Sequence, residues 1–214
     1  MTSIISKWKD ILSRFSGKGI YPTELAFLLD NPLRKFILSP KNLSERLHLS
    51  SNQTVLEIGS GPGYFSTEVA KNIHNGYLVL FDVQSEMLLK GRNKLRHNKA
   101  SNASCVQGNA ELLPFNAEVF DAVFLVTVLG EVTNPKECLI AINKVLKNYG
   151  TLSVTEMKGD PDIIPQDELK NLVNNCGFEF YEIFSSRTGY TMNFKKISSP
   201  IFLAANSLFS FHSH

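Results

Sequence analysis

The sequence has few cysteines and no arrangement of them that suggests a disulfide or a metal site. Cys105, Cys138 and Cys176 are the only three, and none belongs to a C-x-x-C pair or stands at a Cys/His metal-ligand spacing. An odd number of isolated cysteines is typical of a reducing compartment. We therefore expect free, buried thiols, no bound metal and a cytoplasmic location.

Long apolar runs and a strong charge bias are also missing. Lys7 and Lys9 interrupt the N-terminal segment before it reaches signal-peptide length, and the late apolar run 200–211 is far shorter than the roughly 20 residues of a membrane helix. The net charge is only +2, so we expect neither a nucleic-acid partner nor a membrane span. The 214 residues suffice for one domain with a substantial core.

The most informative stretch that is present is a glycine-rich segment at residues 55–64, which reads VLEIGSGPGY. Its apolar start predicts a strand, its three glycines a tight loop, and the residues that follow Tyr64 a helix. Glycines suit a loop that brings a ligand against the main chain, because they leave no Cβ in the way. The ligand would lie at the carboxyl end of the strand. An ordinary turn between strand and helix is the alternative for this segment taken alone.

The spacing of the glycines and a nearby carboxylate indicate the kind of ligand. A dinucleotide fingerprint is G-x-G-x-x-G, whereas Gly59, Gly61 and Gly63 form G-x-G-x-G, with Tyr64 at the position of the expected third glycine. Glu57, two residues before the first glycine, would repel a diphosphate but suits an ammonium or sulfonium group. The segment therefore predicts a partly cationic ligand.

Strands and helices alternate after this loop, which predicts right-handed βαβ units in a mostly parallel sheet. We expect a doubly wound α/β fold with seven strands, a C-terminal antiparallel hairpin and N-terminal covering helices. The expected strands beyond the first are 77–81, 104–107, 119–126, 151–155, 178–184 and 190–197, and the expected helices are 85–97, one from 134 that ends at 148–150, and 167–176.

Two polar residues follow the second and third strands. Asp82 lies 82 − 63 = 19 residues after Gly63, near the roughly 20-residue offset at which a carboxylate binds a ribose hydroxyl in this topology. A cap for the helix near Ser85 is the alternative, and the two roles can coexist. Asn109 opens the loop after the third strand, and its side-chain oxygen can accept a hydrogen bond from an amino group of a ligand. An Asx-turn is the alternative role for Asn109.

Five segments in order, over about residues 53–157, resemble the class I S-adenosylmethionine-dependent methyltransferases. They are the glycine loop, the acid at Asp82, G-N-A-E-L-L-P-F at 108–115, F-D-A-V-F-L-V at 120–126 and L-K-N-Y-G-T-L at 146–152. The likeness is to the small-molecule enzymes of the ubiquinone and menaquinone type. The chain departs from the family's segments at Asn109, where the family has an acid, and at Asn148 and Tyr149, where it has proline and glycine.

The resemblance implies S-adenosyl-L-methionine as cofactor and a small, partly apolar methyl acceptor. The cofactor-binding residues that follow from the loop and the matching segments are Glu57, Gly59, Ser60, Gly61, Gly63, Tyr64, Asp82, Val83, Met87, Asn109, Ala110 and Val126. No catalytic residue is indicated, because a sulfonium leaving group needs chiefly in-line approach and exclusion of water. A scaffold without catalysis, an RNA methyltransferase and, more remotely, a nicotinamide enzyme are the alternatives.

The N-terminal residues predict helices that cover the rest of the chain. Residues 3–15 carry Trp8, Ile11 and Phe15 at helical spacing, with charged residues between them. We expect residues 1–50 to form a covering segment, 51–200 the methyltransferase domain and 201–214 an apolar tail. The segment 1–30 is predicted to be a lid over the cofactor, with a fixed helix on the core as the equal alternative.

Overall fold

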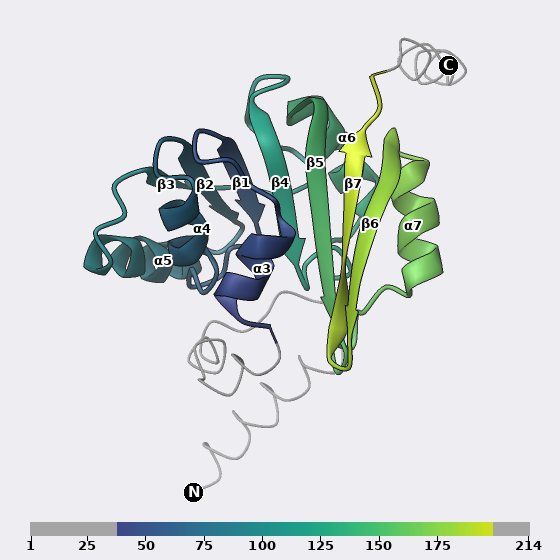
Figure 1. Cartoon of the computed structure of the whole chain (residues 1–214), viewed down its shortest axis with the longest axis horizontal. Helices are drawn as coiled ribbons and strands as arrows, with labels where there is room; N and C mark the ends of the chain where they lie inside the picture. Colours follow the sequence, from purple (N-terminus) through teal and green to yellow (C-terminus); the bar gives the residue numbers. More distant parts are fainter. Residues whose placement is uncertain (1–37, 199–214) are drawn as a thin grey trace, which may run out of the picture.

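The computed structural model describes residues 38–198. The predicted helix at 3–15, the predicted lid at 1–30 and the C-terminal tail at 201–214 lie outside these residues. The described part confirms the α/β fold, with seven strands in one sheet and helices on both of its faces (Figure 1).

The sheet is organised around β1 (Thr54–Ile58), which carries the start of the glycine-rich segment. The strand order is β3-β2-β1-β4-β5-β7-β6. Its first five strands run parallel, and they are β3 (Ala103–Gln107), β2 (Tyr77–Asp82), β1, β4 (Phe120–Val126) and β5 (Leu146–Met157). The chain turns outward from β1 in both directions, so a crevice is expected between the carboxyl ends of β1 and β4.

The predicted hairpin closes the other side of the sheet. It consists of β6 (Phe178–Ser186) and β7 (Gly189–Lys196). The later strand, β7, lies inside, antiparallel to both β5 and β6. This pairing leaves β3 and β6 as the two edges of the sheet.

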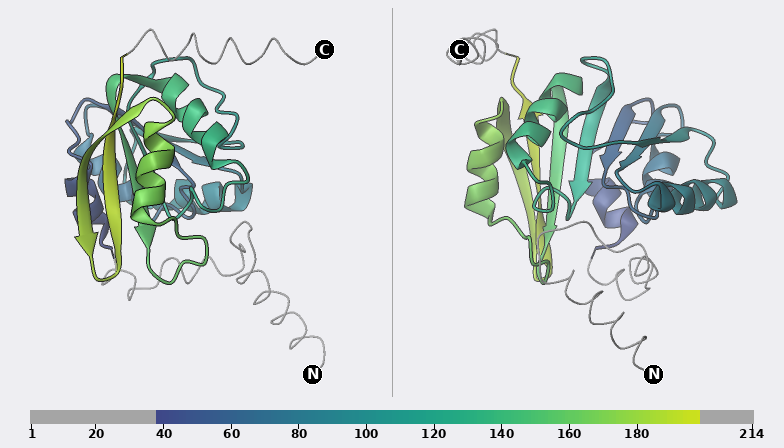
Figure 2. Two further views of the ribbon diagram at one scale, coloured as in Figure 1. Left: turned by 90° about the vertical axis from the view of Figure 1, so that its right-hand side faces the viewer. Right: turned by 180° about the vertical axis from the view of Figure 1, so that it is seen from behind.

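Two helical layers cover the sheet, and each encloses a hydrophobic core (Figure 2). One layer contains α3 (Pro40–Arg46), α4 (Ser66–Asn72) and α5 (Ser85–His97), and the other contains α6 (Pro135–Val145) and α7 (Gln166–Asn174). Alternate residues of the strands face the two layers, so Val55 packs toward α4 while Leu56 packs toward α6.

Helix starts follow their capping residues. The Ser39 hydroxyl accepts from the N–H of Asn42 at 3.1 Å and Pro40 takes the first position of α3. In the same way the Asn134 side chain accepts from Glu137 at 3.3 Å at the start of α6. The start at Asn134 was predicted, and both starts have the same cause, because Ser and Asn side chains satisfy the free N–H groups of the first turn and proline there loses no bond.

The boundary between α6 and β5 differs from the prediction. We expected the helix to end at Asn148–Gly150, but it ends at Val145, and Leu146 is already extended and paired with Phe120 in β4. Tyr149 follows with a φ of 63°, and a Cβ on Gly150 would lie 2.8 Å from the Leu146 side chain. The predicted turn is therefore an irregular start of β5, because burial of Leu146 against the sheet outweighs another helical turn.

Candidate active site

A cavity of about 240 Å³ opens at the carboxyl ends of β1, β2 and β4, the lower edge of the sheet in Figure 1. Five stretches contribute to its wall: 57–62 with 64 and 65, 81–84 with Met87, 108–111, 126–128 and 131–133. The structure thus brings together eleven of the twelve predicted cofactor-binding residues. Gly63 is the exception.

The three loop glycines all have positive φ, at 67° for Gly59, 53° for Gly61 and 73° for Gly63. A Cβ on Gly59 would lie 2.3 Å from a methyl group of Val128, so the loop passes directly beside the segment after β4. A Cβ on Gly63 would lie 3.0 Å from the Cα of Gly91 in α5. Gly63 therefore allows close packing between the glycine loop and α5.

Glu57 is a buried carboxyl on the wall of the cavity. It is 3% exposed, and the Ser66 hydroxyl donates to its Oε2 at 2.5 Å. Burial raises the pKa of Glu57 to about 8, with a further increase from Asp82, against opposing effects of Ser66 and Lys94. A cation entering the cavity would favour the charged form and lower this pKa.

Asp82 joins the end of β2 to the glycine loop. Its Oδ2 accepts from the N–H of Gly61 at 2.8 Å and its Oδ1 from the N–H of Gln84 at 2.9 Å. Burial raises its pKa, and backbone hydrogen bonds oppose that rise. The alternative that Asp82 caps α5 is wrong, since Gln84 occupies the N-cap and makes no side-chain capping bond.

The loop after β3 forms the opposite wall. Asn109 makes the Asx-turn named as its alternative, because its side-chain oxygen accepts from the N–H of Glu111 at 2.9 Å. It nevertheless lines the cavity, as do Ala110 and the half-exposed Val83. Met87 is buried at 2% exposure and also lines the cavity.

The segment after β4 holds residues that sequence reasoning missed. Thr127, Val128, Glu131, Val132 and Thr133 line the cavity beyond the predicted Val126. Burial and nearby carboxylates raise the pKa of Glu131 to about 8. One feature of the sequence could have indicated Glu131: it is a carboxylate five residues after the end of β4, at the edge of the sheet where ligands bind.

Other predicted features have mixed outcomes. Cys138 and Cys176 are buried free thiols as expected, but Cys105 is only half-buried, because β3 lies at an edge of the sheet. Within residues 38–198 no cluster of three His, Cys, Asp or Glu side chains could hold a metal. No helix in that range is long and apolar enough to cross a membrane.

The family model of the methyltransferase domain matches residues 49–193, which span the sheet from before β1 into β7. The chain belongs to the methyltransferase domain family. The class I S-adenosylmethionine-dependent methyltransferase predicted from five ordered segments is thereby confirmed. The glycine loop and Asp82 of this methyltransferase stand at the ends of β1 and β2, where the resemblance required them.

Relatives of this methyltransferase include the ubiquinone/menaquinone biosynthesis C-methyltransferase UbiE of Proteus mirabilis, 39% identical over 107 residues. That match covers 49% of this chain and 43% of the relative, so the chain spans less than half of that protein. The UbiE protein of Haemophilus ducreyi is 31% identical over 177 residues, covering 64% of this chain and 68% of the relative.

Solved structures share the fold at lower identity. A SAM-dependent methyltransferase from Aquifex aeolicus superimposes with a TM-score of 0.79 at 18% identity, covering 83% of this chain and all of that one. A methyltransferase from Methanococcus maripaludis, described as putative and S-adenosyl-L-methionine-dependent, has a TM-score of 0.70 at 18% identity, with 86% and 98% coverage. These likenesses confirm the Rossmann-like arrangement of the sheet.

Proposed function

We propose that this domain binds S-adenosyl-L-methionine in the cavity at the ends of β1, β2 and β4 and transfers its methyl group to a small, partly apolar acceptor. The observation that carries the proposal is the position of two buried carboxyls, Glu57 and Asp82, on either side of the glycine loop that lines this cavity. S-adenosylmethionine offers an ammonium and a ribose diol at matching places along its length.

Each predicted residue has a proposed role that its surroundings support. Glu57 faces the ammonium group of the cofactor, and Asp82 accepts from the ribose hydroxyls. Val83 and Met87 contact the purine ring, and Asn109 with Ala110 binds its polar edge. The remaining contacts come from the loop and from the end of β4, and these residues are Gly59, Ser60, Gly61, Tyr64 and Val126. Gly63 supports the loop through its packing on α5.

The lining of the cavity also favours this cofactor over a dinucleotide. A pyrophosphate in contact with the loop would approach Glu57 and Asp82, both buried and both costly to hold next to another anion. A sulfonium gains from the same carboxylates. Methyl transfer then requires an acceptor held in line with the sulfur–methyl bond and water excluded from the site.

The acceptor side of the cavity has apolar side chains in its wall, Val126, Val128 and Val132, beside the polar Thr127, Glu131 and Thr133. This composition supports an acceptor with an apolar body. The relatives act in ubiquinone and menaquinone biosynthesis as C-methyltransferases, and we extend that chemistry to this chain as an aromatic ring that carries hydroxyl groups.

The division into segments and the location of the protein belong to the same proposal. Residues 51–200 are the proposed methyltransferase domain, although Leu43 of α3 is fully buried against α4, so the segment 1–50 contributes to the core. The free thiols of Cys138 and Cys176 support the cytoplasm as the proposed location.

Calorimetry with S-adenosylmethionine, and separately with NAD, tests the proposed cofactor. We expect heat of binding with the first and none with the second. Methyl transfer is tested with cofactor labelled in its methyl group, incubated with a lipid extract and with a prenylated 1,4-naphthohydroquinone. Label in the organic phase supports methyl transfer to a small, partly apolar acceptor. Binding without transfer to any acceptor favours a scaffold, and label in added RNA favours the RNA methyltransferase.

A further inference from the structure

Glu131 stands on a turn that the rest of the fold holds in place. Its N–H donates to the carbonyl of Val128 at 3.0 Å, which closes the turn after β4. The preceding Gly130 lies directly against the loop after β5, since a Cβ there would be 1.9 Å from the carbonyl oxygen of Asp162. Glu131 is one of the residues that line the cavity, and it does so from this turn. Among residues 38–198 no hydrogen bond or ion pair reaches the Glu131 carboxylate.

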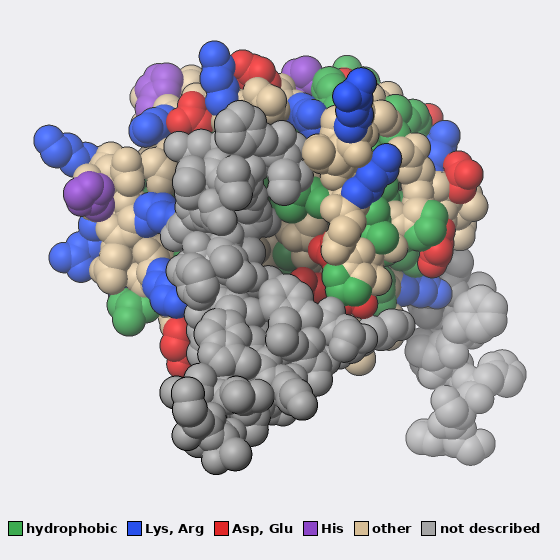
Figure 3. Space-filling view, turned by 90° about the horizontal axis from the view of Figure 1, so that it is seen from below, with side chains coloured by type: hydrophobic (Ala, Val, Ile, Leu, Met, Phe, Trp, Pro, Cys, Tyr) green, Lys and Arg blue, Asp and Glu red, His purple; other side chains and the backbone are tan. Residues whose placement is uncertain are grey.

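Other acids surround Glu131. Burial is the largest cause of its raised pKa, followed by the charges of Asp160, Asp162 and Asp82. Glu156 of β5 adds to the group. It is 1% exposed, and its Oε1 has no hydrogen-bond partner in the described structure. Figure 3 looks onto this edge of the sheet and shows acidic side chains on it. The group as a whole therefore has a high affinity for protons.

The proposed cofactor position brings the reacting methyl group to this turn. With the ribose on Asp82 and the ammonium on Glu57, the sulfonium lies between them. The wall left to face its methyl group is the segment after β4, where Val128, Glu131 and Val132 line the cavity. An acceptor entering there would meet Glu131 among valine and threonine side chains.

We propose that Glu131 is the general base of the reaction and removes a proton from a phenolic or enolic hydroxyl of the acceptor. This inference rests on the proposed methyl transfer. The acceptor's O–H bond breaks and its proton passes to the Glu131 carboxylate. Electrons from the oxygen, or from the ring carbon conjugated with it, form the new bond to the methyl carbon. When the ring carbon is methylated, that carbon then loses its hydrogen as a proton to water and the oxygen regains a proton, which restores the aromatic ring. The sulfur–methyl bond breaks and leaves a neutral thioether.

The proton affinity of Glu131 selects the kind of hydroxyl. Its pKa of about 8 lies moderately below that of a phenol, for which the tyrosine value of about 10 is a guide, so the transfer is only mildly uphill. An aliphatic hydroxyl resembles water, with a pKa of about 15.7, and is out of reach of this base. A neutral phenol also enters the valine-lined wall without the cost of burying a charge.

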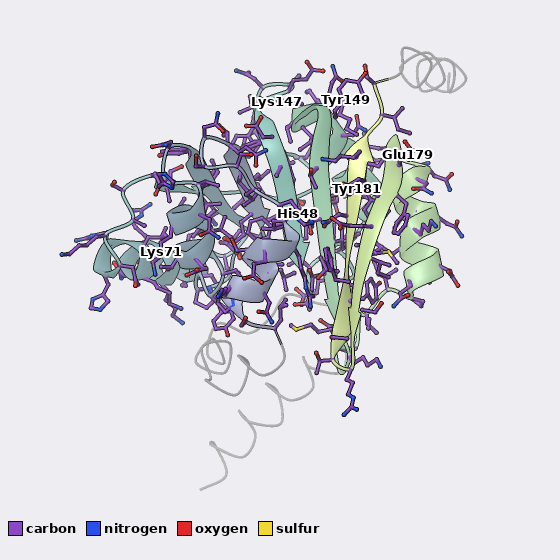
Figure 4. All side chains as sticks on the ribbon, in the orientation of Figure 1. His48, Lys71, Lys147, Tyr149, Glu179 and Tyr181 are labelled. Atoms are coloured by element: carbon purple, nitrogen blue, oxygen red, sulfur yellow. The ribbon has the colours of Figure 1, made fainter. Side chains whose placement is uncertain are left out.

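The test measures cofactor binding and methyl transfer separately, as functions of pH, in the intact chain. The substitution Glu131→Gln keeps the size of the side chain and removes the base, and Glu131→Asp keeps a carboxylate on a shorter stem. Glu179→Gln is the matched control, because Glu179 is exposed on β6 (Figure 4) and does not line the cavity. Asp160→Asn removes a neighbouring charge, and its amide oxygen can still accept from the N–H of Asp162.

We expect all four variants to bind S-adenosylmethionine like the wild type. The wild-type rate should rise with pH, because only the carboxylate form of Glu131 is active, and the bound sulfonium should place this rise below the pKa of about 8 that Glu131 has in the cofactor-free protein. Glu131→Gln should lower kcat about 100-fold or more. It should also move the rising limb of the pH–rate profile toward the acceptor's own pKa near 10. Glu131→Asp should restore part of the rate. Asp160→Asn should shift the limb to lower pH, since it lowers the pKa of Glu131.

Each contrary result has a distinct meaning. If Glu131→Gln transfers the labelled methyl group at a rate within threefold of the wild type and with the same pH–rate profile, Glu131 is not the base. The proposed methyl transfer itself would remain supported. Label recovered as an N-methyl group overturns the hydroxyl class of acceptor. If the wild type binds cofactor but methylates neither extract nor naphthohydroquinone, the proposed function is overturned, and the base with it.

Discussion

At the scale of single residues, the site depends on carboxyls held out of water. Glu57 and Asp82 are almost fully buried, and their partners within the described chain are a hydroxyl and backbone N–H groups. Such groups carry a cost of burial that a cationic, hydroxyl-bearing ligand relieves. Cofactor binding and the protonation of the site are therefore linked.

Asp82→Ala should weaken the binding of S-adenosylmethionine by a few kcal/mol. Two hydroxyl-to-carboxylate bonds are lost, at roughly 1.5 to 3 kcal/mol each, and water entering the site offsets part of that loss. The bond that holds the N–H of Gly61 is lost as well. Calorimetry measures the change, with Asp167→Ala on the exposed first turn of α7 as control. An unchanged dissociation constant would leave Asp82 with a purely structural role.

Asn109→Asp should tighten cofactor binding, because the bond from the adenine amino group becomes charge-assisted. A carboxylate can still accept from the N–H of Glu111, so the Asx-turn should persist and the comparison is clean. The two dissociation constants are measured by calorimetry at one pH. Looser binding in a folded variant would mean that the Asn109 side chain serves the turn alone.

Sequence reasoning found the residues that follow strand ends and missed those set by packing. Glu57, Asp82 and Asn109 each stand at a fixed offset from a glycine or a strand, and the structure brings them to one cavity. Glu131 stands five residues after β4, but that offset alone does not bring it to the cavity. Its relation to the cavity depends on how Gly130 lies against Asp162, a contact between distant segments that no local pattern records.

At the scale of elements, the glycine loop is positioned by its neighbours on three sides. The carbonyl of Phe81 in β2 accepts from the N–H groups of Gly59 and Ser60, at 2.8 and 3.2 Å. The side chain of Val128 lies against Gly59, and α5 approaches Gly63 through its own Gly91. The loop is therefore held in place by β2, α5 and the segment after β4.

Gly61→Val should abolish cofactor binding while the domain remains folded. A branched side chain at a φ of 53° is strained and would occupy the space of the ligand against the loop. Gly159→Val is the matched control, since Gly159 also has a positive φ, of 91°, but nothing within 4 Å of its Cβ position. Thermal shift with cofactor distinguishes them. Equal shifts in both variants would exclude the loop from the site.

Element boundaries were predictable where a cap or an apolar run sets them. The expected helix at 85–97 matches α5, and β2 is the predicted run of buried residues ending at Asp82. The end of α6 was not predictable, because Leu146 is compatible with either a helix or a strand. Its pairing with Phe120 decides the conformation, and that partner lies 146 − 120 = 26 residues away.

At the scale of the whole molecule, three carboxyls within residues 38–198 have pKa values far above their ordinary range. Burial is the first cause in each case, and it raises the pKa of Glu57, Glu131 and Glu156 to about 8. Their usual value is 4.5. Between these values the folded chain holds protons that the unfolded chain has released. Stability contributed by these groups is complete below the usual value and is lost as the pH rises toward 8.

We therefore expect the cofactor-free protein to be less stable at pH 8.5 than at pH 5.5. The loss should be at least about 1 kcal/mol, because a tenfold difference in proton affinity between the folded and unfolded chain corresponds to about 1.4 kcal/mol. Urea unfolding at the two pH values measures the difference. Glu156→Gln removes one of the three groups and should flatten the dependence. A free energy of unfolding that rises over this interval would show that these carboxyls are charged and compensated in the folded chain.

The place of β7 within the sheet has a consequence for synthesis on the ribosome. Because β7 lies between β5 and β6, the edge of β5 stays open until residues 189–196 have been translated. During that interval β6 cannot reach its final place, and the nascent chain presents an unpaired strand to other chains. A nascent chain that has not yet released residues 189–196 from the ribosome is an aggregation-prone intermediate, whereas a chain that has released them can complete the sheet.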